Sequence, residues 1–178
     1  DAVVIGGVAL AVEPARSAVF ALLDRLPVGT TVVFDPNLRA ELWRADPAPV
    51  LRQAIAAADI VKLSADEVGQ MGLITAPEEL LQMGVDTVVW TAGAAGAEMI
   101  STEDGPWGAG QWAVDGASPD AVVDTTGAGD AFLAGVVAGL LDGRSAEATL
   151  TLANRVGATV TTAIGAMDAL PDRSAIGL

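Results

Sequence analysis

The residues best suited to chemistry form one short run, Asp124-Thr125-Thr126-Gly127-Ala128-Gly129-Asp130. Gly127, Ala128 and Gly129 have little or no side chain, so a ligand can approach their backbone N–H groups closely. The apolar residues that follow recur with the spacing of one helical face, which places these groups at a helix start, where donors are unpaired and the dipole favours anions. Asp130 lies within that start and is suited to taking a proton from an attacking hydroxyl. The run therefore predicts a phosphoryl-transfer site, while a helix cap with a tight turn remains the structural alternative.

The elements that must position this run alternate between short β-rich segments and helical stretches. We expect strands over 2–5, 30–34, 60–63 and 87–90, and a hairpin or edge region over 97–100 and 110–114. We expect helices over 14–26, 47–58, 67–71, 77–83, 127–141 and 145–162. The apolar run 2–12 is interpreted as a buried strand with a turn after it, since it is shorter than the roughly 20 residues of a membrane span. The alternation predicts an α/β fold of three layers, with a mostly parallel central sheet covered by helices on both faces.

Polar residues follow several of the predicted strands at their carboxyl ends. In open parallel sheets, ligands bind beyond this edge. The sequence therefore predicts that the residues in question gather there: Asp35 and Asn37 after one strand, Ser64 and Glu67 after the next, Thr91 and Gly93 after a third, and Asp124 and Asp130 after the last.

Composition excludes several classes of function. The 178 residues suit one domain, and 9 Lys and Arg against 23 Asp and Glu give a net charge of −14. That balance argues against nucleic acid and acidic membranes as partners, since both require basic patches. The chain has no cysteine, which is compatible with a reducing cytoplasm, where we expect the protein to reside. It also has no histidine and no tyrosine, so acid–base chemistry falls to carboxylates or lysine.

Beyond these patterns, the sequence resembles the ribokinase-like (PfkB) carbohydrate kinases, and among them the fructokinases. The resemblance covers essentially the whole chain, but it corresponds only to the carboxy-terminal, nucleotide-binding and catalytic part of such a kinase, here residues 1–178. The family's amino-terminal strands, early glycine-rich sugar motif and β lid are missing, and with Asp1 as first residue we expect a processed, truncated or partly observed polypeptide. The motifs that carry the resemblance are the run 124–130, Phe34-Asp35-Pro36-Asn37-Leu38-Arg39 with Leu42-Trp43, the segment 58–67, the segment 89–96, Ala153-Asn154, Gly165-Ala166 and Leu170-Pro171.

The resemblance implies a role for each matched residue. Asp130 is the base, and Gly127, Ala128 and Gly129 form the anion hole. Glu67 helps to hold a Mg²⁺–water network. The nucleotide and its phosphates would be contacted by Ser64, Thr91, Gly93, Gly96, Asn154 and Arg39. Asp124 and Thr126, with the backbone of Val160, Ala163 and Gly165, match a monovalent-cation site, so K⁺ joins ATP and Mg²⁺ as a candidate cofactor.

Each of these roles has a structural alternative. Ser64 and Glu67 are also typical of a helix cap and first turn, and Arg39 of a surface ion pair. Lys62 is suited either to phosphate or to a salt bridge at a strand end. Thr91, Gly93 and Gly96 are compatible with a plain turn, and Asn154 with a polar helix face. Gly135 and Gly139 are interpreted as positions of close helix packing.

The resemblance implies ATP-dependent phosphorylation of a sugar hydroxymethyl group, with fructose as the expected substrate. Its partners would be the sugar and ATP, and a homodimer is left open. Alternatives are a kinase of 2-keto-3-deoxygluconate or another carbohydrate, and a catalytically silent nucleotide-binding fragment. A dinucleotide-binding dehydrogenase fits poorly, because the run 127–130 lacks the further glycine and the downstream acidic residue of that fingerprint.

Overall fold

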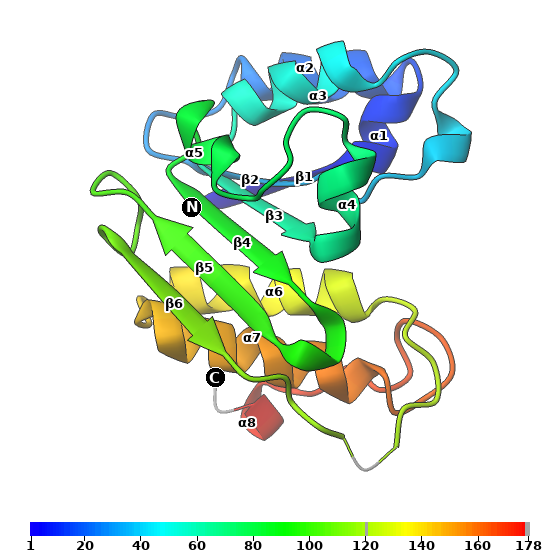
Figure 1. Ribbon diagram of the computed structural model, residues 1–178, viewed down its shortest axis with the longest axis vertical. Coiled ribbons are helices and arrows are strands. Elements are labelled where there is room, and N and C mark those ends of the chain that lie inside the picture. Colours follow the sequence, from blue (N-terminus) through cyan, green and yellow to red (C-terminus); the bar gives the residue numbers. More distant parts are fainter. Residues whose placement is uncertain (120, 177–178) are drawn as a thin grey trace. The chain divides into compact units, whose positions relative to one another are not determined.

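The computed structural model describes residues 1–119 and 121–176. Six strands form one sheet in the order β1-β2-β3-β4-β5-β6 (Figure 1). The first three strands pair in parallel, with Val3 opposite Val32 and Phe34 opposite Val61. The strands are β1 Ala2–Gly6, β2 Thr31–Asp35, β3 Ile60–Ser64, β4 Thr87–Thr91, β5 Ala97–Ser101 and β6 Gly110–Val114.

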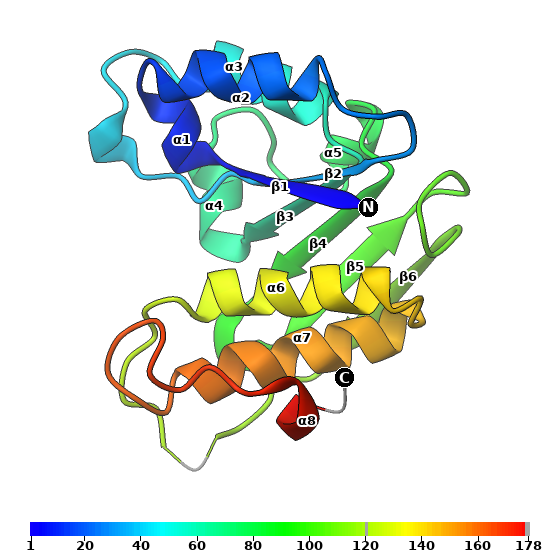
Figure 2. The same ribbon diagram turned by 180° about the vertical axis from the view of Figure 1, so that it is seen from behind.

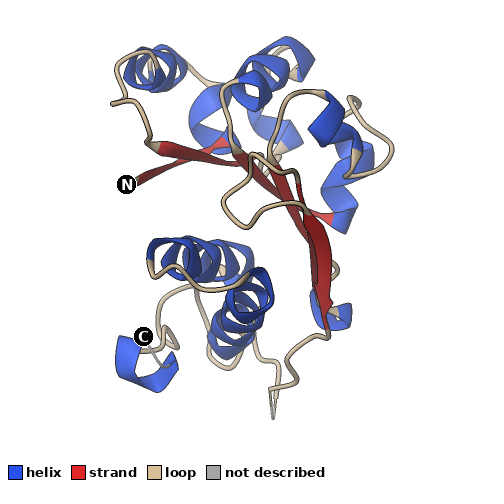
Figure 3. Ribbon diagram, turned by 90° about the vertical axis from the view of Figure 1, so that its left-hand side faces the viewer, coloured by secondary structure: helices blue, strands red, loops and turns tan. Residues whose placement is uncertain are grey.

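The chain divides into two compact units, of which the first comprises Asp1–Trp90 and Ile100–Gly110. Its helices lie on one side of β1–β4 (Figures 1 and 3). β-branched and aromatic residues on β2 and β3 pack there against α3, in a core that includes Phe34, Leu51, Ile55, Val61 and Leu63. The helices are α1 Gly7–Ala11, α2 Ala15–Leu23, the short 3₁₀ turn η1 Ala40–Leu42, α3 Ala48–Ala56, α4 Ala65–Gln70 and α5 Glu79–Gln82.

The second unit comprises Thr91–Met99 and Gln111–Leu178. Its elements besides strand segments are η2 Gly93–Ala95, α6 Ala128–Leu141, α7 Ala146–Val160 and α8 Arg173–Ile176. The long helices α6 and α7 lie side by side (Figures 2 and 3). Glycines permit this contact, as predicted: a Cβ at Gly135 would meet Ala153 Cα at 2.6 Å, and one at Gly139 would meet Thr149 Oγ1 at 2.6 Å.

Most predicted elements are confirmed within a few residues of the expected ends. The turn expected after the first strand is wrong, because residues 7–11 form helix α1. Glycine is required at its start, since a Cβ on Gly7 would lie 1.7 Å from the Pro36 carbonyl oxygen. α2 ends at Leu23 instead of 26, and the 3₁₀ turns and α8 are not predicted by the sequence. No helix in the described ranges combines the length and the hydropathy needed to cross a bilayer.

Candidate active site

Helix α6 begins with three small residues, Gly127, Ala128 and Gly129, which have little or no side chain. Gly127 is its N-cap residue and adopts φ +79°, a left-handed conformation that favours glycine. A side chain there would also collide with Ala166, whose Cβ lies 2.6 Å from the position of a Gly127 Cβ. The Ala128 N–H donates to the Thr125 carbonyl at 3.2 Å, so one of the three predicted anion donors is partly engaged within the turn.

Asp130 lies in the first turn of α6 and its side chain is exposed. A general base has to reach a hydroxyl on a bound substrate, which a carboxylate packed in an apolar core could not do. The residue therefore has the exposure that the predicted role requires, and Gly129 beside it is exposed as well.

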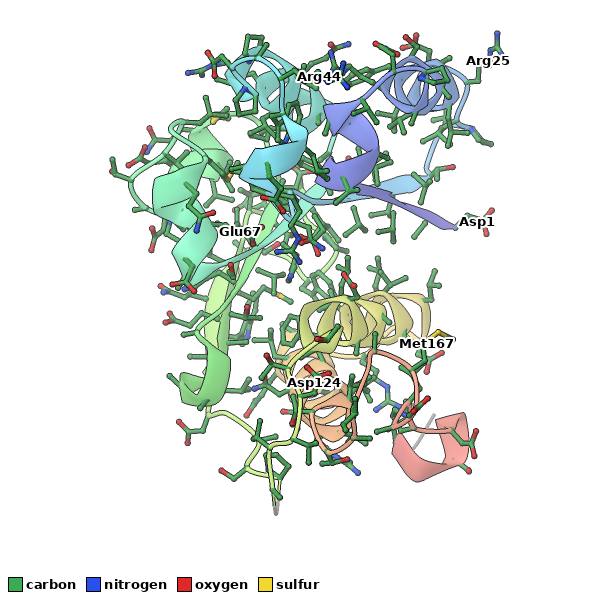
Figure 4. All side chains as sticks on the ribbon, turned by 90° about the vertical axis from the view of Figure 1, so that its right-hand side faces the viewer. Asp1, Arg25, Arg44, Glu67, Asp124 and Met167 are labelled. Atoms are coloured by element: carbon green, nitrogen blue, oxygen red, sulfur yellow. The ribbon has the colours of Figure 1, made fainter. Side chains whose placement is uncertain are left out.

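Asp124 holds two loops of the second unit together. Its Oδ2 accepts the Gly165 N–H at 2.9 Å, and its Oδ1 accepts the Thr126 N–H at 2.9 Å and the Thr126 hydroxyl at 2.7 Å. These bonds, that from Gly165 first, hold the pKa of Asp124 below its ordinary value of 3.8. The segment before α6, where Figure 4 labels Asp124, is thereby fixed to the loop that follows α7.

The segment 89–96, which the resemblance matches to a nucleotide loop, contains the 3₁₀ turn η2 and two glycines in the left-handed region, Gly93 at φ +55° and Gly96 at φ +115°. The Ala92 N–H donates to the Gly96 carbonyl at 2.9 Å and closes the loop. Gly96 is buried, whereas residues 92–95 are exposed and Thr91 is half-buried. The loop is thus a closed turn that presents backbone to solvent.

Asn154, on α7, donates its side-chain amide to the Asp115 carbonyl at 3.0 Å. Asp115 directly follows β6, so this bond fixes the end of that strand to the helix. The structure therefore gives Asn154 a partner within the protein, which the sequence did not predict.

In the first unit, Glu67 is buried on α4, where Figure 4 labels it. Its Oε2 accepts the Ser64 N–H at 2.8 Å and the Ser64 hydroxyl at 2.9 Å, and its Oε1 accepts the Leu38 N–H at 2.8 Å. Ser64 and Glu67 form the capping box of α4, so the structural alternative for both residues is realised. The bond to Leu38 adds a second function, since it connects the segment after β2 to the helix after β3.

Lys62 and Asp35 form a buried ion pair on neighbouring strands, with 3.1 Å between Nζ and Oδ2. Burial raises the pKa of Asp35, the charge of Glu67 adds to that effect, and Lys62 opposes it. Asp35 Oδ1 also accepts the Asn37 N–H at 3.1 Å. The salt-bridge interpretation of Lys62 is therefore confirmed.

Arg39 follows directly on this network and is exposed. Lys62 pairs with Asp35, and Arg144 with Asp142. Arg39 is not in either pair, so the predicted surface ion pair is not found there.

These contacts limit how metal ions could be held. A carboxylate has about four acceptor positions, and three of those on Glu67 are occupied by protein donors, which leaves room for one water and not for a closed coordination shell. Asp124 keeps its charge to lower pH than usual, but it also accepts three protein hydrogen bonds, which leaves about one acceptor position for a hard cation. In the described ranges, no three or more carboxylates gather into a metal-binding group.

The structure thus assigns the predicted residues to two groups, one in each unit. Arg39, Ser64 and Glu67 belong to the first unit. The second unit holds Thr91, Gly93, Gly96, Asp124, Thr126, the run 127–130 and Asn154. Sequence reasoning missed the Leu38 N–H, which Glu67 accepts, and Gly116, where a Cβ would lie 2.1 Å from the Ala94 carbonyl oxygen of the predicted nucleotide loop. The position of Gly116, just after a predicted strand, was the available signal for it.

The sequence matches the pfkB family of carbohydrate kinases over residues 1–173. It is 40% identical over 179 residues to a fructokinase of Klebsiella pneumoniae, covering 92% of this chain and 56% of that protein. A double mutant of the fructokinase of Vibrio cholerae O395, solved in a fructose-, ADP- and potassium-bound form, matches with a TM-score of 0.83 and 32% identity over 99% of this chain and 59% of its own. Aminoimidazole riboside kinase of Salmonella enterica, solved with aminoimidazole riboside and an ATP analogue, matches with a TM-score of 0.85 and 34% identity over 99% of this chain and 61% of its own.

These likenesses confirm the three-layer α/β class with a mostly parallel sheet. They also show that the chain spans little more than half the length of the relatives described. The match over 173 of the 178 residues identifies the chain as a member of the pfkB family of carbohydrate kinases.

Proposed function

We propose that this chain carries the catalytic and nucleotide-binding part of an ATP-dependent kinase that phosphorylates a sugar hydroxymethyl group. The observation that carries the proposal is the exposed carboxylate of Asp130 in the first turn of α6, directly after the bare backbone of 127–129. A helix start attracts the negative charge of a phosphoryl group, and a base beside it can take the proton of the acceptor hydroxyl.

In the proposed reaction, the hydroxymethyl oxygen attacks the γ-phosphorus of ATP while its proton passes to the Asp130 carboxylate. The bond between the γ-phosphorus and the oxygen bridging to the β-phosphate breaks, and ADP leaves with that electron pair. The amide groups of Gly127, Ala128 and Gly129 stabilise the charge that develops on the transferring group.

The other predicted residues would hold ATP and its ions. Thr91, Gly93 and Gly96 belong to a closed turn whose residues 92–95 are exposed, and Ser64 and Arg39 are proposed for further contacts to nucleotide and phosphate. Mg²⁺ would neutralise charge on the phosphates, with Glu67 acting through one water. K⁺ is proposed for the oxygens of Asp124 and Thr126 and nearby backbone carbonyls.

Fructose is the proposed acceptor, since fructokinases stand among both the curated relatives and the solved structures. The likeness to aminoimidazole riboside kinase favours a second candidate, another carbohydrate with a free hydroxymethyl group, and 2-keto-3-deoxygluconate belongs in the same set. Because the chain spans 56% of the Klebsiella relative, a nucleotide-binding module without transfer activity is the remaining alternative.

The test measures ATP binding by calorimetry and ADP release with fructose, aminoimidazole riboside and 2-keto-3-deoxygluconate, for the wild-type chain and for Asp130→Asn. A positioned base contributes about 10²–10⁴-fold to turnover, so Asp130→Asn should lose about that factor while it binds ATP as the wild type does. Asp168→Asn, an exposed carboxylate of the second unit, serves as the control. Binding without transfer to any sugar would identify a silent module, and wild-type turnover in Asp130→Asn would remove Asp130 from the base role.

A further inference from the structure

The nucleotide loop of the second unit crosses the chain after β6 with backbone directly against backbone. A Cβ at Gly96 would lie 2.1 Å from the Val114 carbonyl oxygen, and a Cβ at Gly116 would lie 2.1 Å from the Ala94 carbonyl oxygen. Both distances are far below any real carbon–oxygen contact. Each of the two crossing segments therefore requires a glycine, Gly96 in one and Gly116 in the other, so that their backbones can lie in contact.

The same short stretch is held from α7. The Asn154 amide donates to the Asp115 carbonyl at 3.0 Å, and Asp115 lies between the two residues that face the loop, Val114 and Gly116. Asn154 thus fixes one side of the crossing to a 15-residue helix, which is a rigid support. The loop on the other side is closed by short-range bonds within residues 92–96, of which 92–95 are exposed.

We propose that Asn154 and Gly116 are positioning residues for the nucleotide: Asn154 fixes the 115–116 peptide, and the loop 92–96 takes its place by packing against that peptide. This inference rests on the proposed function, in which the loop binds ATP. It gives Asn154 an indirect role through the Asp115 backbone in place of contact with the nucleotide. It also adds Gly116, which has no side chain with which to contact any ligand.

The experiment compares the wild-type chain with Asn154→Ala, Gly116→Ala and Thr151→Ala. Thr151 lies on the same helix, where its hydroxyl donates to the Glu147 carbonyl at 2.8 Å, so its loss should leave the loop unchanged. Two quantities are measured: hydrogen exchange of the Ala95 and Gly96 amides without nucleotide, and the dissociation constant for ATP. The exchange measurement does not depend on ATP binding.

We expect Asn154→Ala and Gly116→Ala to speed exchange in the loop and to weaken ATP binding together. One net hydrogen bond converts to roughly three- to tenfold in the dissociation constant for Asn154→Ala. Gly116→Ala should weaken binding further, because its Cβ must displace backbone and cannot be relieved by a side-chain rotation. The double variant should lose less than the product of the two effects, since both act on one contact.

Weaker ATP binding by Asn154→Ala with unchanged loop exchange would overturn the inference, because it would mean direct contact with the nucleotide. Unchanged exchange in Gly116→Ala, in a chain that unfolds as the wild type does, would overturn it as well. Failure of the proposed function looks different: the wild-type chain would bind no ATP, while the two variants would still speed exchange in the loop.

Discussion

At the scale of single residues, the buried pair of Lys62 and Asp35 is the most sensitive point of the first unit. Both side chains are almost completely buried, and Asp35 also accepts the Asn37 N–H. Three residues after Asp35, the Leu38 N–H donates to the Glu67 carboxylate. The pair therefore fixes the start of the segment that presents Arg39, and an unpaired charge in this place would be costly.

Lys62→Met should destabilise the chain by about 3–5 kcal/mol, because it leaves the Asp35 carboxylate buried without its partner. The free energy of unfolding in urea measures this. Arg52→Met, which removes an exposed cation from α3, should stay within about 0.5 kcal/mol of the wild type. In the Lys62→Met background, Asp35→Asn should restore part of the stability, and a further loss there would contradict the ion-pair argument.

The Asp35 carboxylate should also make the free energy of unfolding depend on pH. Since burial raises the pKa of Asp35 above 3.8, the folded state binds the proton more tightly than the unfolded state. Its contribution to stability is fully present below pH 3.8 and is lost as pH rises through the raised pKa.

Asp124 should change the free energy of unfolding with pH in the opposite direction to Asp35, because the pKa of Asp124 is lowered. Its contribution is present above pH 3.8 and is lost as pH falls through the lowered value. We therefore expect the wild type to be more stable than Asp124→Asn at neutral pH, with the difference shrinking in acid. Urea unfolding from pH 7 down to about pH 2 measures it, with Asp168→Asn, which removes an exposed carboxylate from the loop after α7, as the control variant. A constant difference across the range would contradict the role given to the Gly165 N–H.

At the scale of elements, the close contact between α6 and α7 depends on glycines, which have no side chain to separate the two helices. Gly135→Ala should gain helix propensity of up to about 1 kcal/mol but lose about 1–3 kcal/mol to overpacking, since its Cβ would meet the backbone of Ala153. Gly69→Ala on α4 has open space around it and should be stabilising by about 0.5–1 kcal/mol. Urea unfolding distinguishes the two, and equal shifts would contradict the packing argument.

The elements also show what could be predicted from the sequence. Strands and long helices followed from hydrophobic periodicity, and the start of α6 from its small residues, because these signals are local. Helix α1 was missed because Gly6 and Gly7 are typical of a turn, while the need for glycine comes from Pro36, far away in the sequence. The bonds of Glu67 to Leu38 and of Asn154 to Asp115 join segments 29 and 39 residues apart, and no local pattern encodes such contacts.

At the scale of the whole molecule, the sheet has β1 at one end of its strand order. Among the described strands β1 pairs only with β2, and Val4, Val8 and Val12 on or just after it are each about half exposed. An edge strand with unpaired backbone groups and apolar side chains is a template for pairing with another chain.

We therefore expect the 178-residue chain to associate as its concentration rises, with β1 at the contact. Val4→Lys should suppress this association, because charged side chains blunt an edge strand. Val28→Lys adds the same charge at a fully exposed position outside the strands and should not suppress it. Sedimentation velocity over a concentration series provides the measurement, and equal association of both variants would exclude β1 as the contact.

The bond from the Gly165 N–H to Asp124 makes a closed ring of the α6–α7 hairpin, since it joins a residue four positions before α6 to a residue five positions after α7. A segment tied at its two ends cannot fray from either one, so its amides should open to solvent as a single cooperative unit. Asp130, the proposed anion donors of residues 127–129 and Asn154 all lie within this closed segment. Breaking the bond between Gly165 and Asp124 would therefore disturb the proposed base and Asn154 together. Variants that lose only phosphoryl transfer or only ATP binding through this bond should be rare.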